Sequence, residues 1–151
     1  METVLSLFNL ICAGITFLLV ILMVITFRKP RAIGRFAPLL SILLSLLLLA
    51  LFWILSGAHL PWLVAVPLFA LGLALGGVIG FTARMYPQGG RVMGRHSWLF
   101  LFGWGASLVL AQLLAWTSWP LAASLGLAPL VLSTATNIGH EGALLVRRWT
   151  Y

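Results

Sequence analysis

The charged residues of this chain lie in a few short segments and leave long uncharged stretches between them. Only 7% of the residues are charged and 62% are hydrophobic, whereas an average soluble domain carries about 25% charged residues. An α-helix rises about 1.5 Å per residue, so roughly 20 apolar residues cross the ~30 Å hydrocarbon core of a bilayer. The pattern excludes a soluble globular domain, a disordered chain and a disulfide-rich secreted module. It predicts an all-α, polytopic transmembrane helix bundle.

Five apolar stretches are predicted to span the membrane within a single domain, residues 1–151. They are residues 4–27, 36–57, 62–82, 98–118 and 121–146. The first has no basic residue before it and is followed by Arg28-Lys29-Pro30-Arg31, which favours a retained span over a cleaved signal peptide. Residues 85–95, which contain Pro87-Gln88-Gly89-Gly90, are predicted to form a loop.

The fifth stretch contains Pro129 and several polar residues, so four spans followed by a re-entrant segment is the alternative. The chain has nine Lys and Arg against two acidic residues, and the cations follow the first, third and fifth stretches. With five spans all of the cations lie on one side, whereas with four spans Arg147 and Arg148 lie on the other. The positive-inside rule therefore favours five spans in a bacterial inner membrane, with the N-terminus outside and the C-terminus in the cytoplasm. Because topology accounts for the net charge of +7, no nucleic-acid partner is expected.

Small residues recur at every fourth position on the third and fourth predicted spans. Gly72, Gly76 and Gly80 form such a row on the third span, and Gly103 and Ser107 begin a corresponding row on the fourth. Residues at i and i+4 share a helix face, and small residues there let another helix approach closely. The rows predict helix packing, with a groove for a lipid or a substrate as the alternative.

A polar seam is predicted on the fifth span, where Ser133, Asn137 and Glu141 are spaced by four. Such residues normally hydrogen-bond across helices inside a bundle, and Gln112 on the fourth span is a candidate partner. The seam therefore predicts which face of the fifth helix points inward.

Glu141 is the only acidic residue inside a predicted span. Ionisable groups in membrane helices are costly and are usually paired. We predict an ion pair with Arg84, which ends the third span on the same side, and Arg95 is the second choice. The pair could be an interhelical clamp or could take part in proton transfer or substrate binding.

The histidines raise the question of a cofactor. His96 and His140 are both predicted near the cytoplasmic side, where they are weak candidates for the axial ligands of a b-type haem. Hydrogen-bonded or interfacial histidines are the simpler interpretation. The chain has no H-x-x-x-H or H-E-x-x-H spacing, no Asp, and no G-x-S-x-G or Walker A pattern. We therefore expect no metal site and no catalytic residues.

Two segments carry a family resemblance. Residues 71–95 read Leu-Gly-x-x-x-Gly-Gly-x-x-Gly-Phe-Thr-Ala-Arg, followed by a short Gly-rich hairpin and two arginines, and residues 139–148 read from Gly-His-Glu-Gly to Arg-Arg. Together they resemble the CcdC-like family of small bacterial integral membrane proteins. The resemblance implies a bundle of four or five helices without established catalytic residues and a connection to cytochrome c biogenesis. The single cysteine, Cys12, provides no thiol pair for a disulfide relay.

From the small-residue faces and the short loops we expect a non-enzymatic accessory subunit of a larger membrane complex. The resemblance implies a link of this complex to cytochrome c biogenesis or respiration. Its expected partners are the lipid bilayer and either other membrane subunits or further copies of itself. One alternative is a small transporter or substrate-binding component that works as an oligomer, which would need the polar seam to line a cavity. Another is a redox protein that binds b-type haem.

Overall fold

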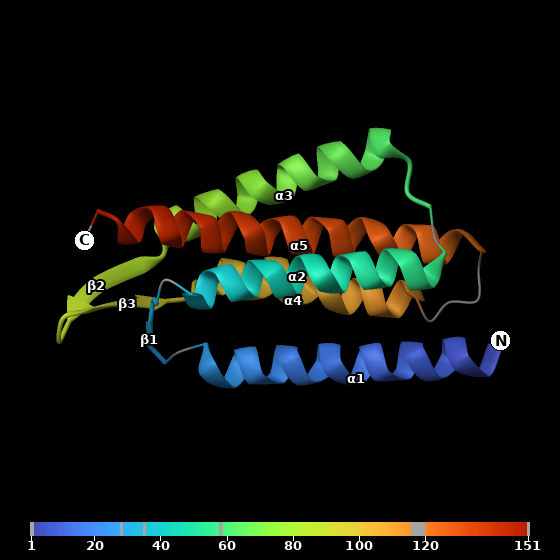
Figure 1. Ribbon diagram of the computed structural model, residues 1–151, viewed down its shortest axis with the longest axis horizontal. Helices are drawn as coiled ribbons and strands as arrows, with labels where there is room; N and C mark the ends of the chain where they lie inside the picture. The colour runs from blue at the N-terminus through green and yellow to red at the C-terminus, as the bar shows by residue number, and fades with distance from the viewer. Residues whose placement is uncertain (1, 28, 35, 58, 116–119, 151) are drawn as a thin grey trace.

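The computed structural model describes residues 2–27, 29–34, 36–57, 59–115 and 120–150. Within them the chain forms five helices that run side by side and three short strands at one end of the bundle (Figure 1). The helices are α1 (Glu2–Thr26), α2 (Phe36–Ser56), α3 (Trp62–Thr82), α4 (Trp98–Ala115) and α5 (Pro120–Arg148). The strands are β1 (Arg31–Ala32), β2 (Arg84–Gln88) and β3 (Arg91–Arg95).

Each helix coincides closely with one of the five apolar stretches, although residues 116–118 of the fourth stretch lie outside the described residues. Two helical segments in the described part, Phe36–Ile54 and Trp62–Thr82, are long and apolar enough to cross a membrane. α5 contains Pro129 and still continues as one helix along the length of the bundle (Figure 1). A re-entrant segment would need two shorter halves with a turn between them, and α5 has no such turn.

The centre of the bundle is α5, which packs against α2, α3 and α4. Leu127 and Ala135 on α5 are completely buried, and Ser133, Asn137 and Glu141 on the same helix are buried as well. α1 lies at the edge of the bundle, where it packs mainly against α4 (Figure 1). The helix with the most polar residues is therefore enclosed, while large apolar side chains of α1, α2 and α3 are exposed.

The segment predicted to be a loop, residues 85–95, instead belongs to a β-hairpin. β2 and β3 pair antiparallel up to Gln88 and Arg91, and the two residues between them, Gly89 and Gly90, have φ of 57° and 74°. A two-residue turn with both φ positive matches the twist of the strands, and glycine adopts it without steric cost. The prediction of a loop for residues 85–95 was therefore wrong, whereas the Gly-rich hairpin named with the family resemblance lies in this segment.

β1 joins the hairpin and makes a three-stranded sheet in the order β1-β3-β2. Arg31 pairs with Gly94 and Ala32 with Met93. The sheet thus ties the link between α1 and α2 to the link between α3 and α4, at the end of the bundle where the C-terminus lies (Figure 1).

The glycine row of α3 faces α5 at very short range. A Cβ added at Gly72 would lie 2.6 Å from Cβ of Ala135, one at Gly80 would lie 2.6 Å from the carbonyl oxygen of His140, and one at Gly76 would overlap the carbonyl oxygen of Thr136. α3 therefore packs closely against α5 through Gly72, Gly76 and Gly80.

The row on α4 does not pack against the α3 glycines. Gly103 is exposed and a Cβ there would meet nothing within 4 Å, and the Ser107 hydroxyl donates to the Gly103 carbonyl of its own helix. Its prediction as the counterpart of the α3 row was wrong, because α5 lies against α3 and supplies its own small residues. Gly139 is one of them, since a Cβ there would overlap the carbonyl oxygen of Leu73.

Candidate functional site

Four ionisable side chains gather at the sheet end of the bundle. They are Arg31 on β1, His96 between β3 and α4, and His140 and Glu141 on α5. Nη2 of Arg31 donates to Oε1 of Glu141 at 2.7 Å. The Glu141 side chain is only 2% exposed, whereas Arg31 is 42% exposed. A buried carboxylate is thus held by a guanidinium that reaches it from the surface.

The predicted partners of Glu141 were wrong. Arg84 and Arg95 face each other across β2 and β3, and both line a cavity rather than contacting Glu141. Arg31 takes the position because β1 pairs with β3 and carries its side chain to α5. A strand of two residues leaves no pattern in the sequence. The positions of the arginines along the chain therefore could not distinguish Arg31 from other cations at a similar depth.

His140 is fully buried in a stack of rings. Its ring centroid lies 4.0 Å from that of Phe100 and 5.2 Å from that of His96. The two histidines, which were predicted only to lie on the same side of the membrane, thus have their rings side by side. Burial, and then the positive charge of Arg31, lower the pKa of His96 to about 3, so this imidazole is neutral near pH 7.

The haem hypothesis fits this geometry poorly. The planes of His96 and His140 are inclined by only 30° and the rings stack face to face. Axial ligands instead point a ring nitrogen at one iron from opposite faces of the porphyrin. Within the described part of the chain, no group of three or more His, Cys, Asp or Glu could hold a metal ion.

Several polar atoms of this cluster are buried without a hydrogen-bond partner among the described residues. They are Nδ1 of His96, both ring nitrogens of His140 and Oε2 of Glu141. Nδ1 of His140 lies 3.6 Å from Oε1 of Glu141, which is within ion-pair range but too long for a hydrogen bond. A buried unsatisfied polar group costs about 1–3 kcal/mol. The bond between Arg31 and Glu141 therefore links α5 to the sheet. The ring nitrogens of His140 and Oε2 of Glu141 form no hydrogen bond with the described residues.

The polar seam of α5 faces inward as predicted. Nδ2 of Asn137 donates to the hydroxyls of Ser41 at 3.1 Å and Ser45 at 2.6 Å, both on α2. Ser133 donates to the carbonyl oxygen of Trp104 on α4 at 3.4 Å. Two of the three seam residues, Asn137 and Ser133, thus bond to neighbouring helices. The side chain of Gln112, its predicted partner, lies outside the described residues.

Comparisons of the chain with protein-family models, with curated proteins and with solved structures find no match. What the chain can do is set by the chemistry of its own residues. These residues form an ion pair between Arg31 and Glu141, a stack of the His96 and His140 rings, and hydrogen bonds between Asn137 and α2.

Proposed function

We propose that this chain is an integral protein of the bacterial inner membrane whose five helices all span the bilayer. The distribution of polarity supports this. Polar residues such as Asn137 and Ser133 are buried at the centre, whereas Leu40 and Leu43 on α2 and Val78 on α3 are more than 60% exposed. Exposed apolar surface on this scale is costly in water and suits a lipid environment.

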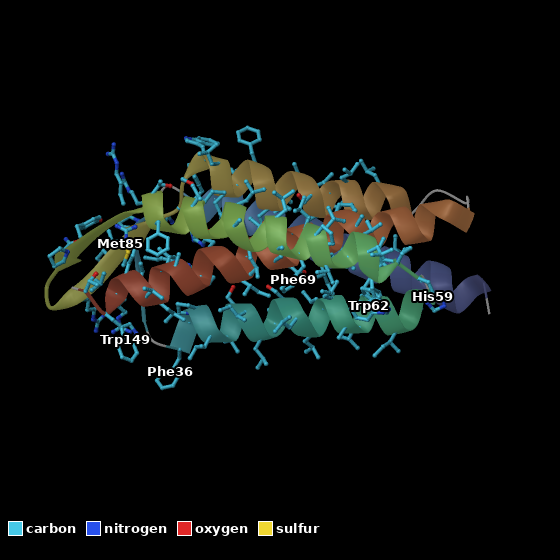
Figure 2. All side chains as sticks on the ribbon, turned by 90° about the horizontal axis from the view of Figure 1, so that it is seen from above. Phe36, His59, Trp62, Phe69, Met85 and Trp149 are labelled. Carbon is cyan, nitrogen blue, oxygen red and sulfur yellow. The ribbon has the colours of Figure 1, made fainter. Side chains whose placement is uncertain are left out.

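The positions of the cations support the orientation with the N-terminus outside. Every described Lys and Arg lies in or next to the sheet or at the C-terminal end of α5, and these lie at one end of the bundle (Figure 1). By the positive-inside rule this end faces the cytoplasm. Exposed tryptophans lie at both ends, with Trp62 at one and Trp149 at the other (Figure 2), as expected for residues that prefer the membrane interfaces.

Within the membrane we propose the role of a non-enzymatic accessory subunit of a larger complex. The observation that carries this proposal is that the buried side chains of Asn137 and Ser133 are hydrogen-bonded to neighbouring helices. A transporter would need these groups to line a cavity, so the same bonds weigh against that alternative. The resemblance of residues 71–95 and 139–148 to the CcdC-like family makes cytochrome c biogenesis or respiration the first context in which to seek the complex.

α1 is the element best suited to contact another subunit. It packs mainly on α4, and its exposed residues, which include Leu10, Leu18 and Ile21, cover most of its circumference. Ala13, in contrast, is buried on the same helix. Ile21 therefore provides an exposed position on α1 for a crosslinking experiment, and Ala13 provides a buried control position on the same helix.

A photo-crosslinking amino acid at Ile21, followed by purification in mild detergent, tests the accessory role. We expect crosslinks from Ile21 to a different integral membrane polypeptide, and crosslinks from Ala13 only within the chain. The purified protein should show no Soret absorbance. Crosslinks from Ile21 to further copies of this chain would favour the oligomeric transporter. A protein that purifies as a monomer and crosslinks to no polypeptide would contradict the accessory role.

A further inference from the structure

Two arginines of the hairpin, Arg84 and Arg95, face each other across its strands. Arg84 and Arg95 are direct partners in the register of β2 and β3. Like charges directly opposite each other in an antiparallel pair are destabilising. Neither arginine has an ion-pair partner among the described residues, and Glu141 is already bonded to Arg31. The fold therefore concentrates positive charge at a point that no acidic side chain of the described residues neutralises.

Both arginines line an open cavity of about 480 Å³, within the range of small-ligand sites. His96 also lines the cavity, and its Nδ1 is buried without a partner among the described residues. Phe27 and Trp98 line it too, with their ring centroids 4.3 Å apart. The cavity is thus lined by two exposed arginines and a histidine together with an aromatic surface.

We propose that this cavity binds a phosphate-bearing anion through Arg84 and Arg95, and that the phosphate belongs to the headgroup of an anionic phospholipid. Guanidinium groups form charge-assisted, often bidentate hydrogen bonds with phosphate oxygens. Phe27 and Trp98 lie where they can contact the glycerol and the first acyl carbons. The phosphate chemistry depends only on the cavity. The lipid source rests on the proposed membrane location, where basic pockets at the cytoplasmic side suit anionic headgroups.

The test uses the full chain in a neutral detergent. Its thermal unfolding is followed while phosphatidylglycerol, phosphatidylcholine or inorganic phosphate is added. We expect phosphatidylglycerol to raise the melting temperature with saturation and phosphatidylcholine to have no such effect. Arg84→Gln and Arg95→Gln should each raise the phosphatidylglycerol concentration at half-saturation by about tenfold, because each removes one strong charged contact. The matched control is Arg91→Gln, because Arg91 lies on β3 opposite Gln88 and does not line the cavity.

The ligand-free variants provide a second readout. Because Arg84→Gln relieves the repulsion across the strands, it should raise the melting temperature without lipid and reduce the further rise that lipid produces. Saturation by inorganic phosphate at similar concentrations would support the phosphate site and assign it to a soluble ligand. Equal responses to the two lipids, or equal losses in Arg84→Gln and Arg91→Gln, would overturn the proposal. Neither result depends on whether a partner subunit crosslinks to α1, so the two proposals can fail separately.

Discussion

Replacing Gly76 by alanine is expected to destabilise the bundle strongly, although the change adds only one methyl group. The new Cβ would overlap the carbonyl oxygen of Thr136 on α5. Backbone atoms cannot rotate away as a side chain can, so α3 and α5 would have to separate along their interface. Overpacking of this kind costs typically 1–3 kcal/mol, and we expect a loss of about 3 kcal/mol. Thermal unfolding in detergent, followed by circular dichroism, measures it.

Gly77 is the matched control because it is the next residue of the same helix. A Cβ at Gly77 would meet nothing within 4 Å. Alanine has a higher helix propensity than glycine by about 0.5–1 kcal/mol, so Gly77→Ala should leave the stability unchanged or raise it slightly. Equal losses from Gly76→Ala and Gly77→Ala would contradict the described contact between α3 and α5.

The second large effect concerns the pair between Arg31 and Glu141, and it should be asymmetric. Arg31→Gln leaves the carboxylate of Glu141, which is 2% exposed, without its partner. Breaking a buried ion pair in this way costs about 3 kcal/mol or more. Glu141→Gln instead leaves a guanidinium that is 42% exposed and can be solvated, so we expect a loss of about 1 kcal/mol.

A double-mutant cycle measures whether the two residues interact. The variant that carries both Arg31→Gln and Glu141→Gln should lose less stability than the two single losses add up to. The reason is that Glu141→Gln removes the carboxylate that Arg31→Gln leaves unpaired. The control cycle pairs Glu141→Gln with Arg84→Gln, whose effects should add because Arg84 lines the cavity instead. Additive losses for Arg31 and Glu141, or coupling between Glu141 and Arg84, would contradict the assignment of this pair.

The helices could be predicted closely from the sequence, whereas the choice of neighbours could not. Long uncharged apolar stretches leave the backbone few alternatives to a helix, and α2 and α3 therefore begin and end close to the predicted residues. The rows of small residues on α3 and α4 indicated faces suited to close packing. They contained no information on whether α3 would meet α4 or α5, because that choice depends on how the links at the sheet end arrange the helices.

The sequence indicated the α5 residues of the candidate site, but it did not indicate which residues they contact. Helical spacing indicated that Ser133, Asn137 and Glu141 share a face, and their burial agrees with this. The partner of Glu141 depends on β1, which is too short to leave a pattern in the sequence. The hairpin, in contrast, had a signal in the sequence, since two adjacent glycines are typical of the two-residue turn that joins β2 and β3. The prediction of a loop for residues 85–95 did not use this signal to place the two strands.

The central claim is that the bundle spans the membrane with its sheet in the cytoplasm, and labelling of single cysteines tests it most directly. In a Cys12→Ser background, His59→Cys and Gln88→Cys place thiols at exposed positions at opposite ends of the bundle; Figure 2 labels His59 near Trp62. A membrane-impermeant maleimide added to intact spheroplasts should label His59→Cys at once and Gln88→Cys only after permeabilisation. Labelling of Gln88→Cys in intact spheroplasts, with or without His59→Cys, would contradict the claim.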